Sequence, residues 1–152
     1  MATDATRILV VDDSALYRQS IQNVLREIDA VEVVGWAKDG VEALAKIEKL
    51  NPDLLTLDVQ MPDMDGIQVL REVKRRRLRV KAIMVSSLTA TGAQVTTDAL
   101  LEGAFDFILK PYGSDSAANR QQLRDALDEK IAAFRSSGTR QGVERDASAE
   151  ET

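Results

Sequence analysis

Three aspartates stand at the ends of two apolar runs in this sequence. Asp12 and Asp13 follow the run 8–11, and Asp58 ends the run that begins at Leu54. Carboxylates that meet at one place repel each other and raise each other's pKa values unless a cation neutralises them. Oxygen ligands select a hard cation, and Mg²⁺ that keeps several of its waters fits such a set best. The three acids are therefore candidate Mg²⁺ ligands.

A hydroxyl and an ammonium group lie at the ends of two further apolar runs. Ser86 ends the run 81–86, and Lys110 follows the run 106–109. A phosphoryl group needs hydrogen-bond donors for its oxygens and positive charge against the negative charge that develops during transfer. A carboxylate beside such groups can attack a phosphoryl donor and form an acyl phosphate. Together these residues indicate phosphoryl transfer to an aspartate.

The positions of the candidates along the chain suggest a role for each. Asp58 lies centrally, with the other acids on one side and Lys110 on the other, so we expect it to be the phosphoacceptor. Asp13 is expected to contact the metal directly, Asp12 to hold its waters, and Gln60 to supply a backbone carbonyl. Taken singly, each residue is better explained as a cap, a turn or a solvated strand end. Their conjunction is what favours a site.

Five short apolar runs alternate with segments of helical periodicity. Most of the runs are near-continuously apolar, as expected of parallel strands that are covered on both faces. Apolar residues recur at helical spacing in the segments that follow the runs. We predict strands at Arg7–Val11, Val31–Ala37, Leu54–Asp58, Lys81–Ser86 and Asp106–Leu109, and helices around Tyr17–Ile28, Val41–Leu50, Gly66–Arg76, Thr91–Leu101 and Leu123–Phe134.

Five strand–helix units predict an α/β fold, a doubly wound five-stranded parallel sheet with five helices of the flavodoxin-like type. The expected strand order is 2-1-3-4-5, in which the winding direction reverses between the first and third strands. Ligand sites of such sheets form at that point, beyond the carboxyl ends of the strands. The three aspartates are thereby predicted to converge on one edge of the sheet, where Ser86 and Lys110 also arrive.

Length and composition exclude several classes of protein. The 152 residues favour one domain, which we place at 1–135, followed by a disordered tail or interdomain linker at 136–152. Cysteine and histidine are absent, so thiolate and imidazole chemistry are excluded within the chain. The net charge of −5 argues against nucleic-acid binding, and the basic cluster of Arg75, Arg76, Arg77 and Arg79 is typical of a solvated helix end. Neither a signal peptide nor a membrane span is indicated, so we expect a cytoplasmic protein.

The motifs around these residues resemble the signature of two-component response-regulator receiver domains. The resemblance implies that a sensor histidine kinase donates a phosphoryl group from a phosphohistidine to Asp58, with Mg²⁺ as cofactor. It also implies a switch that pairs Ser86 with Phe107, the aromatic residue three positions before Lys110. The matching motifs are Val10-Val11-Asp12-Asp13-Ser14, the stretch from Leu57 to Gly66, Ser86 and Lys110-Pro111, within a match from about Arg7 to Phe134.

A narrower resemblance concerns the segments 84–89 and 103–111, which read Met-Val-Ser-Ser-Leu-Thr and Gly-Ala-Phe-Asp-Phe-Ile-Leu-Lys-Pro. They are similar to the receivers of chemotaxis protein-glutamate methylesterases of the CheB type, although Gln60 stands where that family more often has glutamate. The resemblance implies a C-terminal esterase domain with a Ser-His-Asp triad and a chemotaxis receptor as partner. A chain without histidine cannot hold that triad, so we expect it to perform only the phosphorylation and dephosphorylation of its own aspartate.

Three other interpretations remain open. A stand-alone receiver that acts by binding a partner would carry the same residues, and the coding sequence beyond Thr152 would distinguish it from a methylesterase. A haloacid-dehalogenase-like phosphatase also forms an aspartyl phosphate, but that class has a D-x-D motif after its first strand, whereas Asp12 and Asp13 are adjacent. A flavodoxin-like electron carrier shares the topology, but its phosphate loop would be rich in serine, threonine and glycine.

Overall fold

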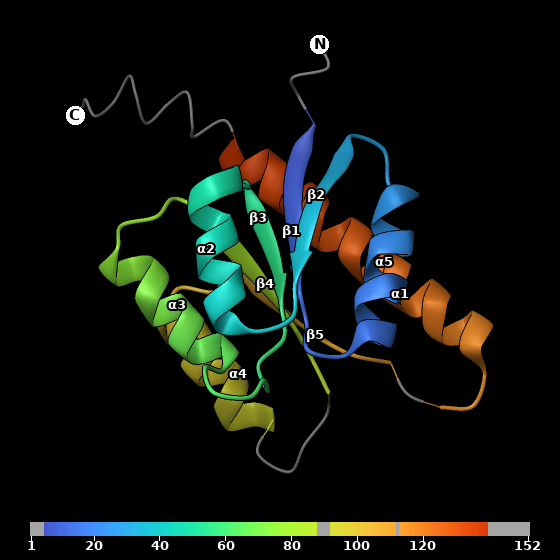
Figure 1. Cartoon of the computed structure of the whole chain (residues 1–152). Coiled ribbons are helices and arrows are strands. Elements are labelled where there is room, and N and C mark those ends of the chain that lie inside the picture. The colour runs from blue at the N-terminus through green and yellow to red at the C-terminus, as the bar shows by residue number, and fades with distance from the viewer. Residues whose placement is uncertain (1–4, 88–91, 112, 140–152) are drawn as a thin grey trace.

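The computed structural model describes residues 5–87, 92–111 and 113–139 of the chain. Five parallel strands form one sheet in the order β2-β1-β3-β4-β5, with helices between successive strands (Figure 1). The strands are β1 (Thr6–Val11), β2 (Val31–Ala37), β3 (Leu54–Leu57), β4 (Lys81–Ser86) and β5 (Asp106–Leu109). The helices are α1 (Ala15–Arg26), α2 (Gly40–Leu50), α3 (Gly66–Arg75), α4 (Gly92–Leu101) and α5 (Ser116–Phe134). The predicted fold class and strand order are confirmed.

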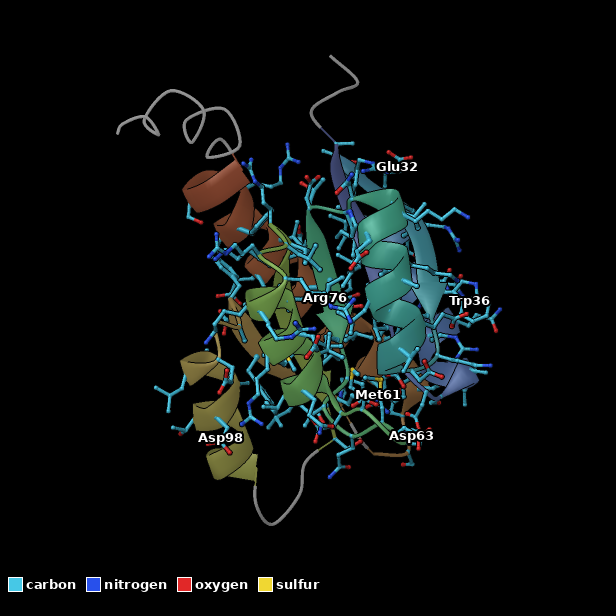
Figure 2. The ribbon with its side chains drawn as sticks, turned by 60° about the vertical axis from the view of Figure 1, so that its left-hand side comes forward. Glu32, Trp36, Met61, Asp63, Arg76 and Asp98 are labelled. Carbon is cyan, nitrogen blue, oxygen red and sulfur yellow. The ribbon has the colours of Figure 1, made fainter. Side chains whose placement is uncertain are left out.

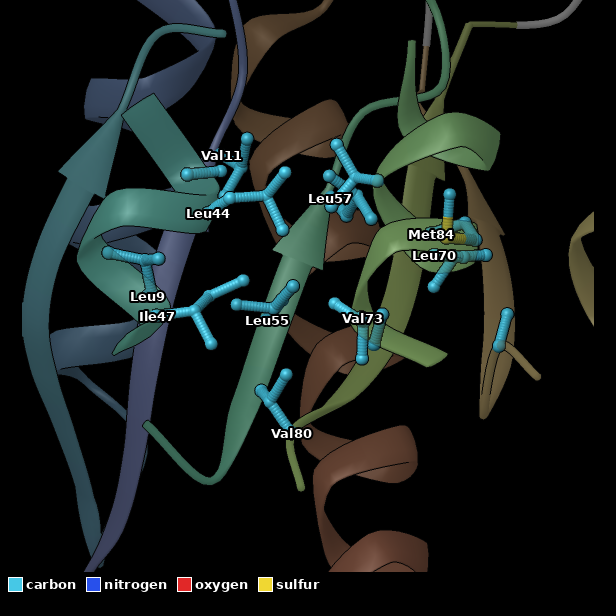
Figure 3. Close-up of a cluster of buried hydrophobic side chains, with 14 of the residues drawn as sticks. Leu9, Val11, Leu44, Ile47, Leu55, Leu57, Leu70, Val73, Val80 and Met84 are labelled. Carbon is cyan, nitrogen blue, oxygen red and sulfur yellow. The ribbon is translucent and has the colours of Figure 1, made fainter. Parts of the chain in front are cut away.

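Helices cover both faces of the sheet, and the alternation of side chains along β1 divides the core between the two layers (Figure 1). Ile8 and Val10 pack with buried residues of α1 and α5, whereas Leu9 and Val11 pack with those of α2, α3 and α4. Figure 3 shows the second of these clusters, in which Leu44 of α2 faces the sheet. Burial on both faces explains why the strands are almost continuously apolar in sequence.

The loop after β3 turns sharply because α3 begins close to the end of that strand. The Gly66 N–H donates a hydrogen bond to the Val59 carbonyl (2.8 Å), and a Cβ at Gly66 would lie 2.3 Å from the Asp58 carbonyl oxygen. A residue with a side chain does not fit in that space. Asp65 and Gln68 form a capping box that fixes the first turn of α3. The backbone of Asp58 is therefore held in place by the start of this helix.

The observed boundaries of several elements differ from the predicted ones by one residue. β1 begins at Thr6, one residue earlier than predicted, and β3 ends at Leu57, so that Asp58 follows the strand. Ile28 lies two residues beyond the end of α1 but is buried in the core layer of α1 and α5. The predicted start of the fourth helix, Thr91, lies outside the described residues.

The described chain continues beyond α5 into the predicted tail. Residues Arg135–Thr139 form a π-helical turn, and residues 140–152 lie outside the described part of the chain. The domain boundary at residue 135 therefore stays a prediction. No helix among the described residues is long and apolar enough to cross a membrane.

The basic cluster at the end of α3 is partly neutralised by acidic neighbours. Arg75 forms an ion pair with Glu72 (2.7 Å), and Arg76, which is labelled in Figure 2, reaches Glu48 on α2 (2.9 Å). Exposed pairs of this kind contribute little to stability. Because α3 runs back from the carboxyl edge of the parallel sheet, the cluster lies at the edge opposite to the three aspartates.

Candidate functional site

Asp12 and Asp58 directly follow neighbouring strands. The Asp12 N–H donates a hydrogen bond to the Ala37 carbonyl at the end of β2 (3.1 Å), and the Asp58 N–H donates to the Val11 carbonyl at the end of β1 (3.0 Å). These two bonds extend the hydrogen-bond ladder of the sheet on either side of β1. Since β2 and β3 lie on opposite sides of β1, the winding direction reverses here, as predicted.

The carboxylates of Asp12, Asp13 and Asp58 meet at this edge. One oxygen of each lies within 4.8 Å of the other two. Asp12 and Asp58 are buried, with 0% and 5% of their surface exposed, whereas Asp13 is exposed to solvent. Three converging oxygen donors with one member in water fit a hard divalent cation that keeps several waters. The predicted convergence of the three acids is confirmed.

The first turn of α1 fixes Asp12. Its Oδ1 accepts a hydrogen bond from the Ser14 N–H (2.8 Å), and Ser14 Oγ accepts one from the Tyr17 N–H (3.2 Å), which caps the helix. The Asp12 carbonyl accepts a hydrogen bond from the Arg18 guanidinium (2.9 Å), which lies over the Trp36 ring at 4.3 Å. The Asp-Asp-Ser segment is therefore a helix cap and a part of the acidic site at the same time.

Lys110 places a buried ammonium group against two of the acids. Its Nζ lies 2.8 Å from Asp12 Oδ2 and 3.5 Å from Asp58 Oδ2. Asp12 Oδ2 accepts no well-aligned hydrogen bond within the described residues, so its contact with Lys110 is mainly one of charge. The Lys110 N–H donates to the Ser86 carbonyl (2.8 Å), and the Lys110–Pro111 peptide bond is trans. This hydrogen bond to the end of β4 thus fixes the backbone position of Lys110.

Among the described residues, the three acids at this edge outnumber the Lys110 ammonium that faces two of them. Burial has the largest effect on Asp58 and, together with the charges of Asp12 and Asp13, raises its pKa from 3.8 to about 7. The Lys110 charge and the Gln60 N–H, which donates to Asp58 Oδ1 at 3.4 Å, offset part of this rise in pKa. With every group ionised two negative charges remain, which a divalent cation would cancel.

Ser86 and Phe107 lie on neighbouring strands. Ser86 is buried at the carboxyl end of β4 opposite Leu109, and Phe107 on β5 lies opposite Met84. Residues two apart on a strand share a face, so the side chains of Ser86 and Phe107 lie on the same face of the sheet. Phe107 is half-buried and packs against the core cluster that contains Met84. Phe107 therefore lies two residues further from the carboxyl end of the sheet than the position opposite Ser86.

Three contacts at the site are not evident from sequence periodicity. Tyr17 lies on the apolar stripe of its helix, which predicts a core residue, yet its ring lies 4.2 Å from Lys110 Nζ. Arg18, the next residue, holds the Asp12 carbonyl. Gln60 contacts Asp58 through its N–H, and a metal contact through its carbonyl stays a prediction. Tyr17 and Arg18 could have been identified from their position in the sequence, because they lie in the first turn of the helix that follows Asp12 and Asp13.

A comparison with families of known proteins agrees with this geometry. Residues 8–124 match the family described as "Response regulator receiver domain", which covers most of the chain. The chain belongs to this family. The match separates the receiver from phosphatases and electron carriers that share an aspartyl phosphate or the same topology.

Among curated proteins, the receiver is similar to two named "Protein-glutamate methylesterase/protein-glutamine glutaminase". It is 46% identical over 129 residues to the protein of this name from Desulfotalea psychrophila, and the alignment covers 85% of this chain and 35% of the relative. It is 46% identical over 134 residues to the protein of this name from Bacillus subtilis, and the alignment covers 88% of this chain and 37% of the relative. The chain thus spans little more than a third of the length of these relatives.

Among solved structures, the receiver is similar to the response regulator domain of Thermotoga maritima CheB. The two superpose with a TM-score of 0.75 at 42% sequence identity, over 86% of this chain and 96% of the other. The similarity therefore covers nearly the whole of that response regulator domain. It supports both the sheet topology and the resemblance of this chain to receivers of the CheB type.

The unbalanced charge predicts that Asp58→Asn stabilises the metal-free receiver at alkaline pH. The pKa of Asp58 is about 7 in the folded chain and near 3.8 in the unfolded chain, so the folded state binds more protons between these values. The free energy of unfolding of the wild type therefore falls as the pH rises from about 4 through 7. The variant lacks this loss and should be more stable at pH 8 by on the order of 2 kcal/mol.

Thermal or urea unfolding in EDTA at pH 5 and pH 8 measures this difference. The advantage of the asparagine variant should be largest at pH 8 and shrink at pH 5. An advantage that is equal at both pH values would show that the charge of Asp58 is not its cause.

Proposed function

We propose that the receiver accepts a phosphoryl group on Asp58 from a phosphohistidine of a sensor histidine kinase. The observation that carries this proposal is the position of the Asp58 carboxylate between two other acids and the Lys110 ammonium, at the switch point of the sheet. Membership of the receiver family supports the same assignment. Asp58 is buried at 5% exposure beside the exposed Asp13, so the site can be reached from that side.

The proposed transfer is a displacement at phosphorus. One Asp58 carboxylate oxygen forms a bond to phosphorus while the bond between phosphorus and the histidine nitrogen breaks, and the leaving imidazole keeps the electron pair. The nucleophile must be ionised, and its raised pKa makes the protonated carboxyl the larger fraction below about pH 7. Positive charge at the site therefore favours the reactive form of Asp58.

The other residues of the site have proposed roles around the transferred group. Asp13 would hold a Mg²⁺ ion directly, Asp12 through its waters, and Gln60 through its backbone carbonyl. When bound, the ion supplies positive charge to the acids and to the phosphoryl oxygens. Lys110 and Ser86 would each donate a hydrogen bond to a phosphoryl oxygen, because Ser86 ends β4 and Lys110 directly follows β5 at this edge.

Phosphorylation of Asp58 predicts a gain of one phosphoryl group in intact mass after incubation with acetyl phosphate and Mg²⁺. Asp58→Asn should abolish the gain, because an amide is not a nucleophile for this transfer. Asp63→Asn is the matched control, since Asp63 is an exposed aspartate in the following loop (Figure 2) with a left-handed backbone (φ 69°) that asparagine tolerates.

The control variant should label at the wild-type rate, and omission of Mg²⁺ should suppress labelling of both. Labelling of Asp58→Asn at the wild-type rate would rule out Asp58 as the acceptor. Labelling that is insensitive to Mg²⁺ would rule out the proposed role of the acids as ligands. These two results are independent of each other.

We further propose that the receiver is the regulatory domain of a chemotaxis protein-glutamate methylesterase. The names of the relatives at 46% identity and the similarity to the CheB receiver support this assignment. The esterase chemistry would lie in a C-terminal domain, because this chain contains no histidine. The alternative is a stand-alone receiver that acts by binding a partner. An in-frame esterase domain after Thr152 in the gene would establish the first, and a stop codon there would exclude it.

The output of the proposed phosphorylation is a change of the surface around β4 and β5. Ser86 would move toward a phosphoryl oxygen, and Phe107, on the same face of the sheet, would turn into the vacated space. In a methylesterase this surface would release the catalytic domain, and in a stand-alone receiver it would bind a partner.

Amide NMR spectra with and without beryllofluoride, a stable phosphoryl mimic, measure this change. We expect shifts from Ser86 through α4 to Phe107 and the start of α5, and a reduced spread in Ser86→Ala, which lacks the hydroxyl. Shifts confined to the neighbourhood of the three aspartates would contradict the switch.

A further inference from the structure

Within the described part of the chain, the Lys110 ammonium contacts three side chains, and one of them is an aromatic ring. Two are the carboxylate oxygens of Asp12 (2.8 Å) and Asp58 (3.5 Å), and the third is the face of Tyr17, whose ring centroid lies 4.2 Å from Nζ. A lysine ammonium has three protons to direct, and an aromatic face attracts a cation within about 6 Å. The ring therefore lies within the range of a cation–π contact with an ammonium that two carboxylates also approach.

Tyr17 is itself fixed at both ends. Its N–H donates to Ser14 Oγ (3.2 Å), the N-cap of α1, and its hydroxyl donates to the carbonyl of Pro111 (3.1 Å), the residue after Lys110. Burial raises the pKa of the Tyr17 hydroxyl, which keeps it protonated and able to donate. The start of α1 is thereby tied to the end of β5, and the ring between these anchors cannot easily move away from Lys110.

We propose that Tyr17 is a positioning residue that holds the Lys110 ammonium beside Asp12 and Asp58 for phosphoryl transfer to Asp58. This inference rests on the proposed phosphorylation of Asp58. An aromatic face suits the task because it attracts the ammonium without neutralising its charge. A third carboxylate in the same place would neutralise the positive charge that the phosphoryl group requires. Tyr17 also covers the lysine, which is only 7% exposed, and so limits the competition of water for its protons.

The rate of phosphorylation by acetyl phosphate in Mg²⁺ tests this role. Tyr17→Leu removes the ring and should slow labelling about three- to tenfold, the range of a partly buried cation–π contact expressed as a rate. Tyr17→Phe keeps the ring but loses the hydrogen bond to the Pro111 carbonyl, so it should slow labelling by less than Tyr17→Leu does. Leu16→Ala is the matched control, since Leu16 is 76% exposed on the same turn, and it should label at the wild-type rate.

A double-mutant cycle with Lys110→Met shows whether Tyr17 acts through the lysine. In the Lys110→Met background, Tyr17→Leu should cause no further loss of rate, because no ammonium remains to be positioned. A purely structural role of the ring would slow labelling equally in both backgrounds. Thermal unfolding of each variant reports whether it is folded, and Tyr17→Met replaces the leucine variant if that protein does not fold.

The outcomes separate this inference from the function on which it rests. Failure of the wild type to label would overturn the proposed phosphorylation of Asp58. Normal labelling of the wild type with no effect of Tyr17→Leu would overturn the role of Tyr17 alone. An equal loss in the Lys110→Met background, or a loss in Tyr17→Phe as large as that in Tyr17→Leu, would also overturn it, because the ring would then not act on the ammonium.

Discussion

The structure at the carboxyl end of the sheet depends on the repulsion among three carboxylates, those of Asp12, Asp13 and Asp58. Two of them are buried, and the Lys110 ammonium lies against these two. Asp12 and Asp58 are brought together by hydrogen bonds that prolong β1 and its neighbours, so the sheet itself creates the repulsion. The charge of Lys110 can neutralise only one carboxylate. The pKa of Asp58 rises to about 7 as a result of burial and of its acidic neighbours. A site in this condition favours the arrival of positive charge, and with it the ionised form of Asp58.

The surrounding elements hold the acids in place against this repulsion. Gly66 lets α3 approach the backbone of Asp58, and the Ser14 cap fixes the turn that carries Asp12. On the other side, the hydrogen bond from Lys110 to Ser86 and the anchored ring of Tyr17 limit where the ammonium can go. Packing on both faces of the sheet supplies the rigidity that these contacts need. The close arrangement of the acids and the ammonium is therefore a consequence of the fold.

The sequence predicts the sheet and the convergence of the acids well, because both follow from simple periodicity. Continuous apolar runs predict buried parallel strands, and the topology then brings Asp12, Asp13 and Asp58 to one edge. The sequence predicts contacts between individual side chains less well. Tyr17 shares the spacing of core residues, and spacing does not show that its ring reaches Lys110 on a distant strand. The closer approach of the lysine to Asp12 than to Asp58 likewise depends on side-chain rotamers, which periodicity does not determine.

Proton release on Mg²⁺ binding tests whether buried and unbalanced carboxylate charge defines this site. Calorimetric titration in two buffers of different ionisation enthalpy counts the protons released per ion bound. Because the pKa of Asp58 is about 7, we expect the release of up to about half a proton per ion at pH 7. Release should approach zero at pH 9, and in Asp58→Asn it should be close to zero at both pH values. Binding without proton release at pH 7, or with equal release in Asp58→Asn, would show that the charge of Asp58 does not define this site.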